Sequence, residues 1–222
     1  MDDKERHSAF MSALVTEHYV LQAAASATVS EAAARASLYV YSLSSSLVAM
    51  GFAARSPEVF RPFAAAILPA VFVLGIFTIV RLVDTGIENQ QALRGIARIR
   101  GYYRTLTPEA SELFSAESGR WPEERTAPPL WSGLCVAYLT TAANMVAFTN
   151  SVVAGAGVAL LFANVLGTDR IGVASALGVV ASVVLMALLL AYQRQRYRNF
   201  QPAAEREETK RAPRGRAVRG QS

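Results

Sequence analysis

Two groups of charged residues flank two long uncharged stretches, residues 36–54 and 62–80, and their types and spacing suit ion binding. They are Glu31 and Arg35 before the first stretch, and Arg81, Asp84 and Glu88 after the second. At spacings of three and four, such residues lie on one face of a helix. If the stretches are antiparallel membrane spans, both groups lie at the same depth. In an oligomer they would then form a ring at the mouth of a pore.

The same five residues also fit a purely structural role. Carboxylates and guanidinium groups that meet between two helices pair as salt bridges, and partial burial at a membrane boundary favours this pairing. Charges just outside a span are ordinary in membrane proteins. A salt-bridge network that locks the two helices together is therefore the alternative to a ring of ion-binding charges.

Polar but uncharged side chains lie inside the same two stretches. Ser42, Ser45 and Ser46 share one face of the first stretch. They can line a narrow hydrophilic path, or they can mark a close helix contact in which a hydroxyl bonds the carbonyl four residues back. Pro69 in the second stretch removes the hydrogen bond to the carbonyl of Ala65, which predicts a kink and a candidate hinge for gating.

Signatures of catalysis or of a bound cofactor are missing from the sequence. Two histidines, His7 and His18, and one cysteine, Cys135, are present, and none of them has the spacing of a metal site. No phosphate-binding loop, dinucleotide fingerprint or nucleophile elbow occurs. The uncharged stretches also lack the ionisable residues that proton-coupled transporters and voltage sensors need. We therefore expect no catalytic residue, no metal and no cofactor, and a protein that is not an enzyme.

The elements that position these residues follow from the distribution of charge. The chain has 222 residues, of which 52% are hydrophobic and only 18% are charged. A helix needs about 20 mostly apolar residues to cross a hydrocarbon core of about 30 Å. Four stretches meet this requirement: residues 36–54, 62–80, 146–166 and 171–192.

Short connections join these spans in pairs, which predicts two transmembrane hairpins. The predicted fold class is therefore all-α, a polytopic membrane protein with four transmembrane helices and long cytoplasmic helical extensions. Five parts follow along the chain: a cytoplasmic N-terminal helix (1–35), the first hairpin (36–80), cytoplasmic helices and a linker (81–145), the second hairpin (146–192) and a basic disordered tail (193–222).

The helical extensions are predicted from local sequence. Residues 8–35 contain neither Gly nor Pro, so a helix should run unbroken into the first span. Ser56 and Pro57 fit the N-cap and first position of the next helix, which should continue past its span. Its apolar face is formed by Val83, Ile87, Ile96, Ile99, Tyr103 and Leu106. Thr107 should cap a short helix that ends near Gly119, before a linker at 120–129 and a helix at 130–145 outside the hydrocarbon.

Small residues recur at helical spacing in the second hairpin. They are Ser151, Gly155 and Gly157 in the third span and Gly172, Ala176 and Gly178 in the fourth. This spacing lets two helix backbones approach closely. We favour packing within the hairpin over a contact between subunits.

Orientation follows from the positive charges. Nineteen of the 22 Lys and Arg residues lie on the side of both termini, and three lie on the other side. The positive-inside rule therefore places both termini in the cytoplasm. Arg194, Arg196 and Arg198 form a basic collar with nearby aromatic residues after the last span, which suits anionic lipid headgroups. The tail carries further arginines, but it has no nucleic-acid-binding motif, so no nucleic acid is expected as a partner.

Two stretches, residues 16–52 (from TEHYVLQAAASATVSEAAAR) and 81–104 (RLVDTGIENQQALRGIARIRGYYR), resemble a family of uncharacterised small actinobacterial membrane proteins with four helices. A cytoplasmic helix that feeds a transmembrane hairpin is also similar in architecture to membrane effectors of bacterial defence systems. The resemblance implies a multi-pass protein of the bacterial cytoplasmic membrane. The expected function is a homo-oligomeric channel or pore-forming effector for a small ion, and the alternative is a non-catalytic scaffold that recruits a cytoplasmic partner.

Overall fold

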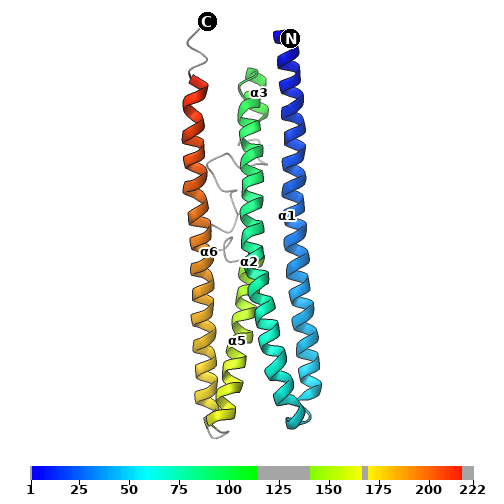
Figure 1. Ribbon diagram of the computed structural model, residues 1–222, viewed down its shortest axis with the longest axis vertical. Helices are drawn as coiled ribbons and strands as arrows, with labels where there is room; N and C mark the ends of the chain where they lie inside the picture. The colour runs from blue at the N-terminus through cyan, green and yellow to red at the C-terminus, as the bar shows by residue number, and fades with distance from the viewer. Residues whose placement is uncertain (1, 115–140, 167–169, 217–222) are drawn as a thin grey trace. The chain divides into compact units, whose positions relative to one another are not determined.

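The computed structural model describes residues 2–114, 141–166 and 170–216, with side chains described up to residue 200 (Figure 1). These residues are almost entirely helical and include no strand, as the all-α prediction requires. The helices are α1 (Asp3–Ala53), α2 (Pro57–Tyr103), α3 (Pro108–Leu113), α5 (Ala142–Leu166) and α6 (Ile171–Arg216).

Helix α1 is unbroken over 51 residues, which confirms that the N-terminal helix continues into the first predicted span. Its sequence explains this length, because Gly51 in the last turn is its first Gly or Pro. Asp3 and Glu5 lie in the first turn, where negative charge interacts favourably with the helix dipole. Glu31 and the serines of the first predicted span, Ser42, Ser45 and Ser46, therefore lie on one continuous helix.

Helix α2 begins where the sequence predicts, because the amides of Val59 and Phe60 donate to the Ser56 carbonyl at 3.1 and 2.9 Å. It then continues over 47 residues with Pro62 and Pro69 inside it. Gly95 within this helix has a packing role. A Cβ atom added there would lie 2.7 Å from Leu21 Cδ1 of α1, so the missing side chain lets α1 and α2 approach closely.

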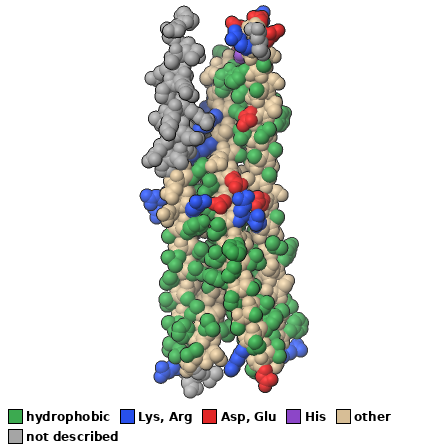
Figure 2. All heavy atoms as spheres, viewed as in Figure 1, with side chains coloured by type: hydrophobic (Ala, Val, Ile, Leu, Met, Phe, Trp, Pro, Cys, Tyr) green, Lys and Arg blue, Asp and Glu red, His purple; other side chains and the backbone are tan. Residues whose placement is uncertain are grey.

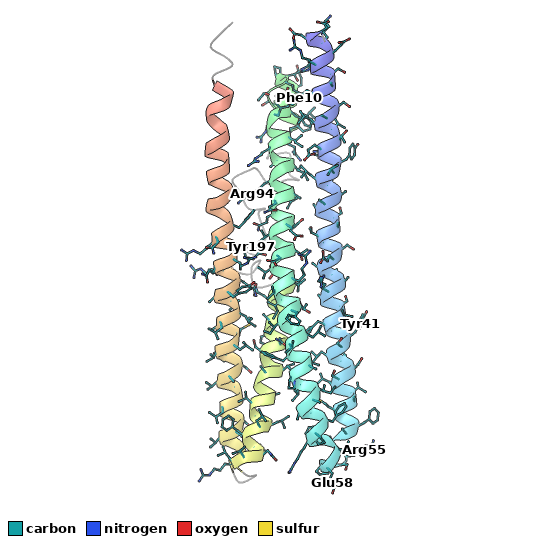
Figure 3. The ribbon with its side chains drawn as sticks, viewed as in Figure 1. Phe10, Tyr41, Arg55, Glu58, Arg94 and Tyr197 are labelled. Carbon is teal, nitrogen blue, oxygen red and sulfur yellow. The ribbon has the colours of Figure 1, made fainter. Side chains whose placement is uncertain are left out.

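The chain forms two compact units, and the first comprises residues Met1–Ala49 and Leu74–Val146. Its buried residues come mainly from α2, with Tyr39 from α1 and Ala143 and Val146 from α5. Tyr39, Ile79 and Val83 are fully buried there. The Phe10 ring packs edge-on against Tyr102 at 5.4 Å, where Figure 3 shows Phe10 near the far end of α2. This ring contact and the close approach of Leu21 to Gly95 join α1 and α2 within the first unit.

The predicted apolar face of α2 is largely confirmed. Val83, Ile96 and Ile99 are buried, and Ile87 and Tyr103 are half-buried. Leu106 differs, since it lies beyond the end of α2 and is 39% exposed. The helix ends before the last member of the periodic pattern, so that residue has no helical face to occupy.

The second unit comprises residues Met50–Val73 and Ala147–Ser222. Here α5 and α6 pack through small residues. A Cβ atom on Gly155 would overlap the Ser182 hydroxyl and the Gly178 carbonyl, and one on Gly178 would lie 2.5 Å from the Gly155 carbonyl oxygen. The Ser182 hydroxyl also donates to the Ser151 carbonyl at 2.9 Å. These contacts confirm packing within the hairpin.

Two of the predicted small residues do not belong to this contact. Gly172 has no atom within 4 Å of an added Cβ, and Gly157 would meet only Leu68 of α2, at 4.0 Å. Asn150, which is fully buried, donates from Nδ2 to the carbonyl of Phe72 at 3.3 Å. In this unit α5 therefore uses one face against α6 and another against α2.

Helix α3 starts as predicted, because the Thr107 side chain accepts a hydrogen bond from the Ala110 amide at 3.1 Å. It ends at Leu113, earlier than the predicted end near Gly119, and residues 115–119 lie outside the described range. The predicted linker at 120–129, most of the predicted helix at 130–145 and Cys135 also lie outside it. The described part of that last segment belongs to α5, which begins at Ala142.

Helix α6 corrects the prediction of a disordered tail, because it continues to Arg216. The segment at 203–211 (AAEREETKR) supplies the reason, since Ala, Glu, Lys and Arg are strong helix formers. The low content of large apolar residues, which suggested disorder, does not oppose a helix that extends an existing one. Residues 217–222 lie outside the described range.

Four of the described helices are long and apolar enough to span a membrane: Asp3–Ala53, Pro57–Tyr103, Ala142–Leu166 and Ile171–Phe200. Each contains one of the four predicted spans. Figure 2 shows mainly hydrophobic side chains along α1 between a band of charged groups and a second charged group at its end. The uncharged residues 36–54 account for this apolar stretch. By length and apolarity, the helices fit a membrane-spanning protein.

Candidate functional site: a charged cluster beside the predicted spans

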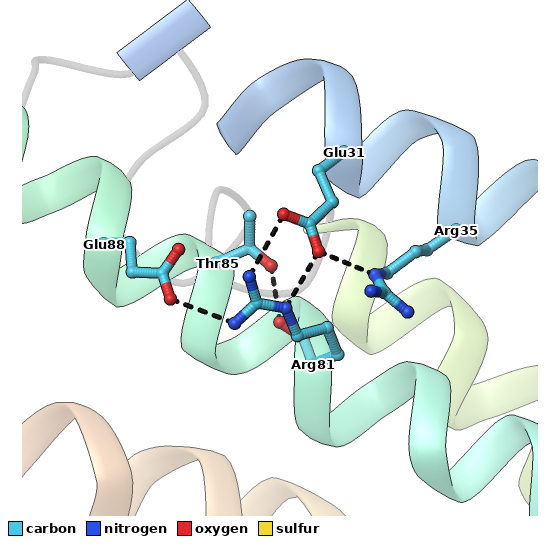
Figure 4. Close-up of polar contacts among 5 residues, drawn as sticks. All are labelled: Glu31, Arg35, Arg81, Thr85 and Glu88. Atoms are coloured by element: carbon cyan, nitrogen blue, oxygen red, sulfur yellow. Dashed lines mark hydrogen bonds and ion pairs between the residues drawn. The ribbon is translucent and has the colours of Figure 1, made fainter. Parts of the chain in front are cut away.

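The charged groups of α1 and α2 meet in the first unit (Figure 4). Glu31 accepts two hydrogen bonds from the Arg81 guanidinium, from Nε to Oε1 at 2.8 Å and from Nη2 to Oε2 at 3.1 Å. The two helices are antiparallel, so a residue just before the first predicted span faces one just after the second. This two-point contact fixes both the distance and the register of the two helices.

The contact extends along both helices into a chain of four charged side chains. Arg35 Nε donates to Glu31 Oε1 at 2.8 Å, and Arg81 Nη1 donates to Glu88 Oε1 at 3.0 Å. Arg81 lies in the centre and uses three of its five N–H donors. The structure thus brings together four of the five predicted residues, and we call these four the charged cluster. Asp84, the fifth, is half-buried on α2 between Arg81 and Glu88.

The hydrogen bonds of the cluster favour the charged forms of Glu31 and Arg81. Hydrogen bonds from Arg81, and then from Arg35, lower the pKa of Glu31 from 4.5 to about 2. The hydrogen bond to Glu31, followed by that to Glu88, raises the pKa of Arg81. The side chains of Glu31 and Arg81 keep 33% and 35% of their surface exposed, so the pair remains accessible to water and ions. The arrangement is the salt-bridge network that the sequence offered as the structural alternative.

Further polar residues next to the cluster were not predicted. The Thr85 hydroxyl donates to the Arg81 carbonyl at 2.6 Å, and Thr85 is buried. One turn before Glu31 on α1, the Thr28 hydroxyl and the Asn89 side-chain oxygen are 3.3 Å apart. No signal for this second pair was present in the sequence, because an antiparallel register with Glu31 opposite Arg81 places Thr28 nearer to Asp84 than to Asn89.

The residues of the predicted serine face differ in exposure, and the predicted hinge lies within a helix. Ser46 donates from its hydroxyl to the Ser42 carbonyl at 2.7 Å, and both residues are half-buried. This is the backbone bond expected of a serine in a close helix contact. Ser45 is exposed. Pro69 lies inside α2, which continues as a helix on both sides of it.

The predicted lipid collar lies on the described part of α6. Arg194, Arg196 and Arg198 are all exposed, and Tyr197 between them is half-buried. Long arginine side chains on an exposed helix face can reach headgroup phosphates while their methylene groups cover apolar surface. Binding of anionic headgroups therefore stays a prediction for these three residues.

We expect acid to weaken the helix pair through Glu31. A carboxylate whose pKa is lowered on folding stabilises the fold fully above its unfolded value, and the contribution is lost as pH falls towards the folded value. For Glu31 this window runs from about pH 4.5 down to about pH 2. Thermal unfolding of the full chain in detergent, followed by circular dichroism, should show a Tm that falls in this window.

The variant Glu31→Gln should lose much of this pH dependence, because glutamine does not titrate. Glu17→Gln is the matched control, since Glu17 is an exposed carboxylate on the same helix and should leave the profile unchanged. Glu109, whose pKa is lowered by its own backbone amide and by Thr107, contributes an acid sensitivity common to all three proteins. Equal pH profiles for the wild type and Glu31→Gln would contradict the assigned role of Glu31.

The chemistry of the charged cluster is electrostatic. In the part of the chain that the structure describes, no three His, Cys, Asp or Glu side chains are placed to hold a metal ion. The cluster offers paired fixed charges of both signs beside a span, which can hold helices together, attract ions or contact headgroups. No protein-family model, no curated protein and no solved structure matches this chain.

Proposed function

We propose that this chain is the subunit of a homo-oligomeric channel for small ions in a bacterial cytoplasmic membrane. The observation that supports the proposal is that α1, which contains the first predicted span, is scarcely buried within its own subunit. Along all 51 residues of α1, Tyr39 is the one buried residue. A helix with so little cover inside its own subunit either faces lipid on nearly all sides or packs against other copies.

The polar groups of α1 favour assembly around a water-filled path. Ser45 is exposed in the middle of an apolar segment, and a hydroxyl that faces lipid lacks partners other than its own backbone. In a ring of subunits, the face that includes Ser45 gains contact with water. A path lined by hydroxyl groups passes small ions without requiring a charge inside the membrane.

The charged cluster would then lie at the cytoplasmic mouth of the path, repeated once in each subunit. Its members pair with one another, so the ring presents fixed charges of both signs. Glu31 contributes one negative charge per subunit, and its ionisation is maintained by Arg81 and Arg35. Rings of charged side chains at a pore mouth set ion selectivity.

Flux measurements in liposomes test this proposal. The reconstituted protein should pass K⁺ or Cl⁻ faster than protein-free liposomes do. Glu31→Gln removes a negative charge and leaves Arg81 without its main partner, so the cation-to-anion permeability ratio should fall by about fivefold. Glu17→Gln should leave the ratio unchanged, because Glu17 lies more than three helical turns from the cluster. A folded oligomer without flux above the protein-free level would contradict the channel proposal.

A scaffold is the second candidate function, and a specific observation favours it. Outside the predicted span, α1 exposes large apolar side chains: Tyr19 is 67% exposed, Val20 56% and Val29 60%. Apolar groups on a helix in water suit contact with another protein. If the folded oligomer conducts no ions, recruitment of a cytoplasmic partner by this part of α1 becomes the better explanation.

A further inference from the structure

One face of α1 outside the predicted span has the spacing of a coiled-coil seam. Its positions are three and four residues apart in strict alternation, and we call them the α1 seam: Ser12, Val15, Tyr19, Gln22, Ser26 and Val29. An alternation of three and four gives the period of 3.5 residues that faces a partner helix in a coiled coil. This pattern differs from the face that packs on α2, which includes Leu21 and Thr28.

Five of the six residues of the α1 seam are exposed, and Gln22 is half-buried. Val15, Tyr19 and Val29 are 46%, 67% and 60% exposed, and Ser12 and Ser26 are also exposed. It carries no charge. Between Ser8 and Ala34, α1 contains three residues of the types Asp, Glu, Lys, Arg or His, namely Glu17, His18 and Glu31. None of them belongs to the seam. A charge-free helix face of this length in water indicates that another helix covers it.

Helix α2 adds a groove beside the seam. Tyr19, Gln22 and Ser26 line one side of this groove, and Leu93 and Ile96 of α2 line the other. The groove is open to solvent and mainly apolar. A helix that packs on the seam can therefore place large side chains between α1 and α2, as a knob enters a hole in a helical bundle.

We propose that the occupant is the α1 helix of a second copy of this chain, packed parallel and in register. The inference rests on the membrane insertion and homo-oligomeric assembly of the proposed function, but it does not require conduction. Chains inserted in one orientation hold their α1 helices parallel, with equal residues at equal depth. A rotation axis along the membrane normal then brings the seams of neighbouring copies together. The absence of charge is what self-pairing needs, because a charged seam would repel its own copy.

Disulfide cross-linking of the full chain tests this arrangement. In a background where Cys135 is replaced by Ser, single cysteines are introduced in the seam as Ser12→Cys and Ser26→Cys. Ala13→Cys and Ala24→Cys are the matched controls, because both residues are exposed and lie on the opposite side of α1. The proteins are oxidised in floated membrane vesicles and then analysed by non-reducing gel electrophoresis and mass spectrometry.

The seam cysteines should form covalent homodimers about tenfold more than the controls, since a disulfide needs Cα atoms within about 7 Å. Equal cross-linking at seam and control positions would overturn the proposal. A seam cysteine that joins a different protein in place of a second copy would also overturn it, and would favour the scaffold.

A charge placed in the seam gives an independent measurement. Tyr19→Asp should reduce the fraction of oligomer in mild detergent, measured by light scattering after size-exclusion chromatography, by about tenfold. Ala24→Asp should leave that fraction unchanged. Circular dichroism checks that both variants keep their helical content, because Tyr19 and Ala24 are exposed. An oligomer that is insensitive to Tyr19→Asp contradicts the seam.

Failure of this inference and failure of the channel proposal give different results. If the protein conducts no ions but the seam cysteines still cross-link, the interface is supported and only the channel proposal fails. Conduction without seam cross-links leaves a channel that assembles through another surface.

Discussion

The variant Gly155→Ala should lower the free energy of unfolding by about 2 kcal/mol. The added methyl group would overlap the Ser182 hydroxyl and the Gly178 carbonyl. The hydroxyl can rotate away, but the carbonyl belongs to the backbone of α6, so the two helices must separate. Overpacking of this kind costs about 1–3 kcal/mol, occasionally more, and alanine returns up to about 1 kcal/mol through its helix propensity. Unfolding by SDS in mixed micelles, followed by circular dichroism, measures the change.

Gly172→Ala is the matched control in the same hairpin. No atom lies within 4 Å of a Cβ at that position, and Gly172 is exposed in the first turn of α6. Its free energy of unfolding should stay the same or rise by up to about 1 kcal/mol. If Gly155→Ala and Gly172→Ala unfold alike, the close contact of α5 and α6 is not the one described.

Tyr39→Ala should lower the free energy of unfolding by about 3 kcal/mol. Tyr39 is fully buried in the first unit, whose core also contains Ile79 and Val83. Truncation of a buried aromatic side chain leaves a cavity and removes many dispersion contacts. Within a membrane this packing is the main force between helices, because lipid is as apolar as the core. The same SDS titration measures the loss.

Tyr41→Ala supplies the control, since Tyr41 is 70% exposed only two residues further along α1. Figure 3 shows its side chain directed away from α2. Its replacement should change the free energy of unfolding by less than about 0.5 kcal/mol. A similar loss for the two tyrosines would contradict the packing of α1 against α2.

The replacement of Tyr39 also bears on the charged cluster, because Tyr39 lies on the same helix as Glu31 and is buried in the same unit. Glu31 lies two turns before Tyr39 on α1. If Tyr39→Ala separates the helices, the pKa of Glu31 should move back towards its ordinary value, since its bond to Arg81 requires contact with α2. The acid sensitivity of the variant would then be smaller than that of the wild type.

The helices and the candidate spans could be predicted from local sequence alone. These are local properties: the absence of Gly and Pro between residues 8 and 35 gives an unbroken α1, and Ser56 followed by Pro57 starts α2. Thr107 likewise starts α3. The uncharged lengths correspond to helices that can cross a membrane, because that requirement depends only on composition and rise per residue.

Local composition was misleading at the end of α6, which continues to Arg216 where disorder was expected. The scarcity of large apolar residues there predicts disorder when the segment is considered alone. A segment rich in Ala, Glu, Lys and Arg needs no core of its own when it prolongs an existing helix, because nucleation is already complete.

Which of several equivalent residues make contacts became clear from the packing of the helices. The sequence placed both Arg35 and Arg81 within possible reach of Glu31, and the structure shows that Glu31 bonds to both of them. It selected Gly155 and Gly178 over Gly157 and Gly172, and buried Tyr39 rather than Tyr41. The physical reason is that helical periodicity defines faces, whereas rotation and register between helices determine which face is buried. These depend on distant residues, so no local pattern contains them.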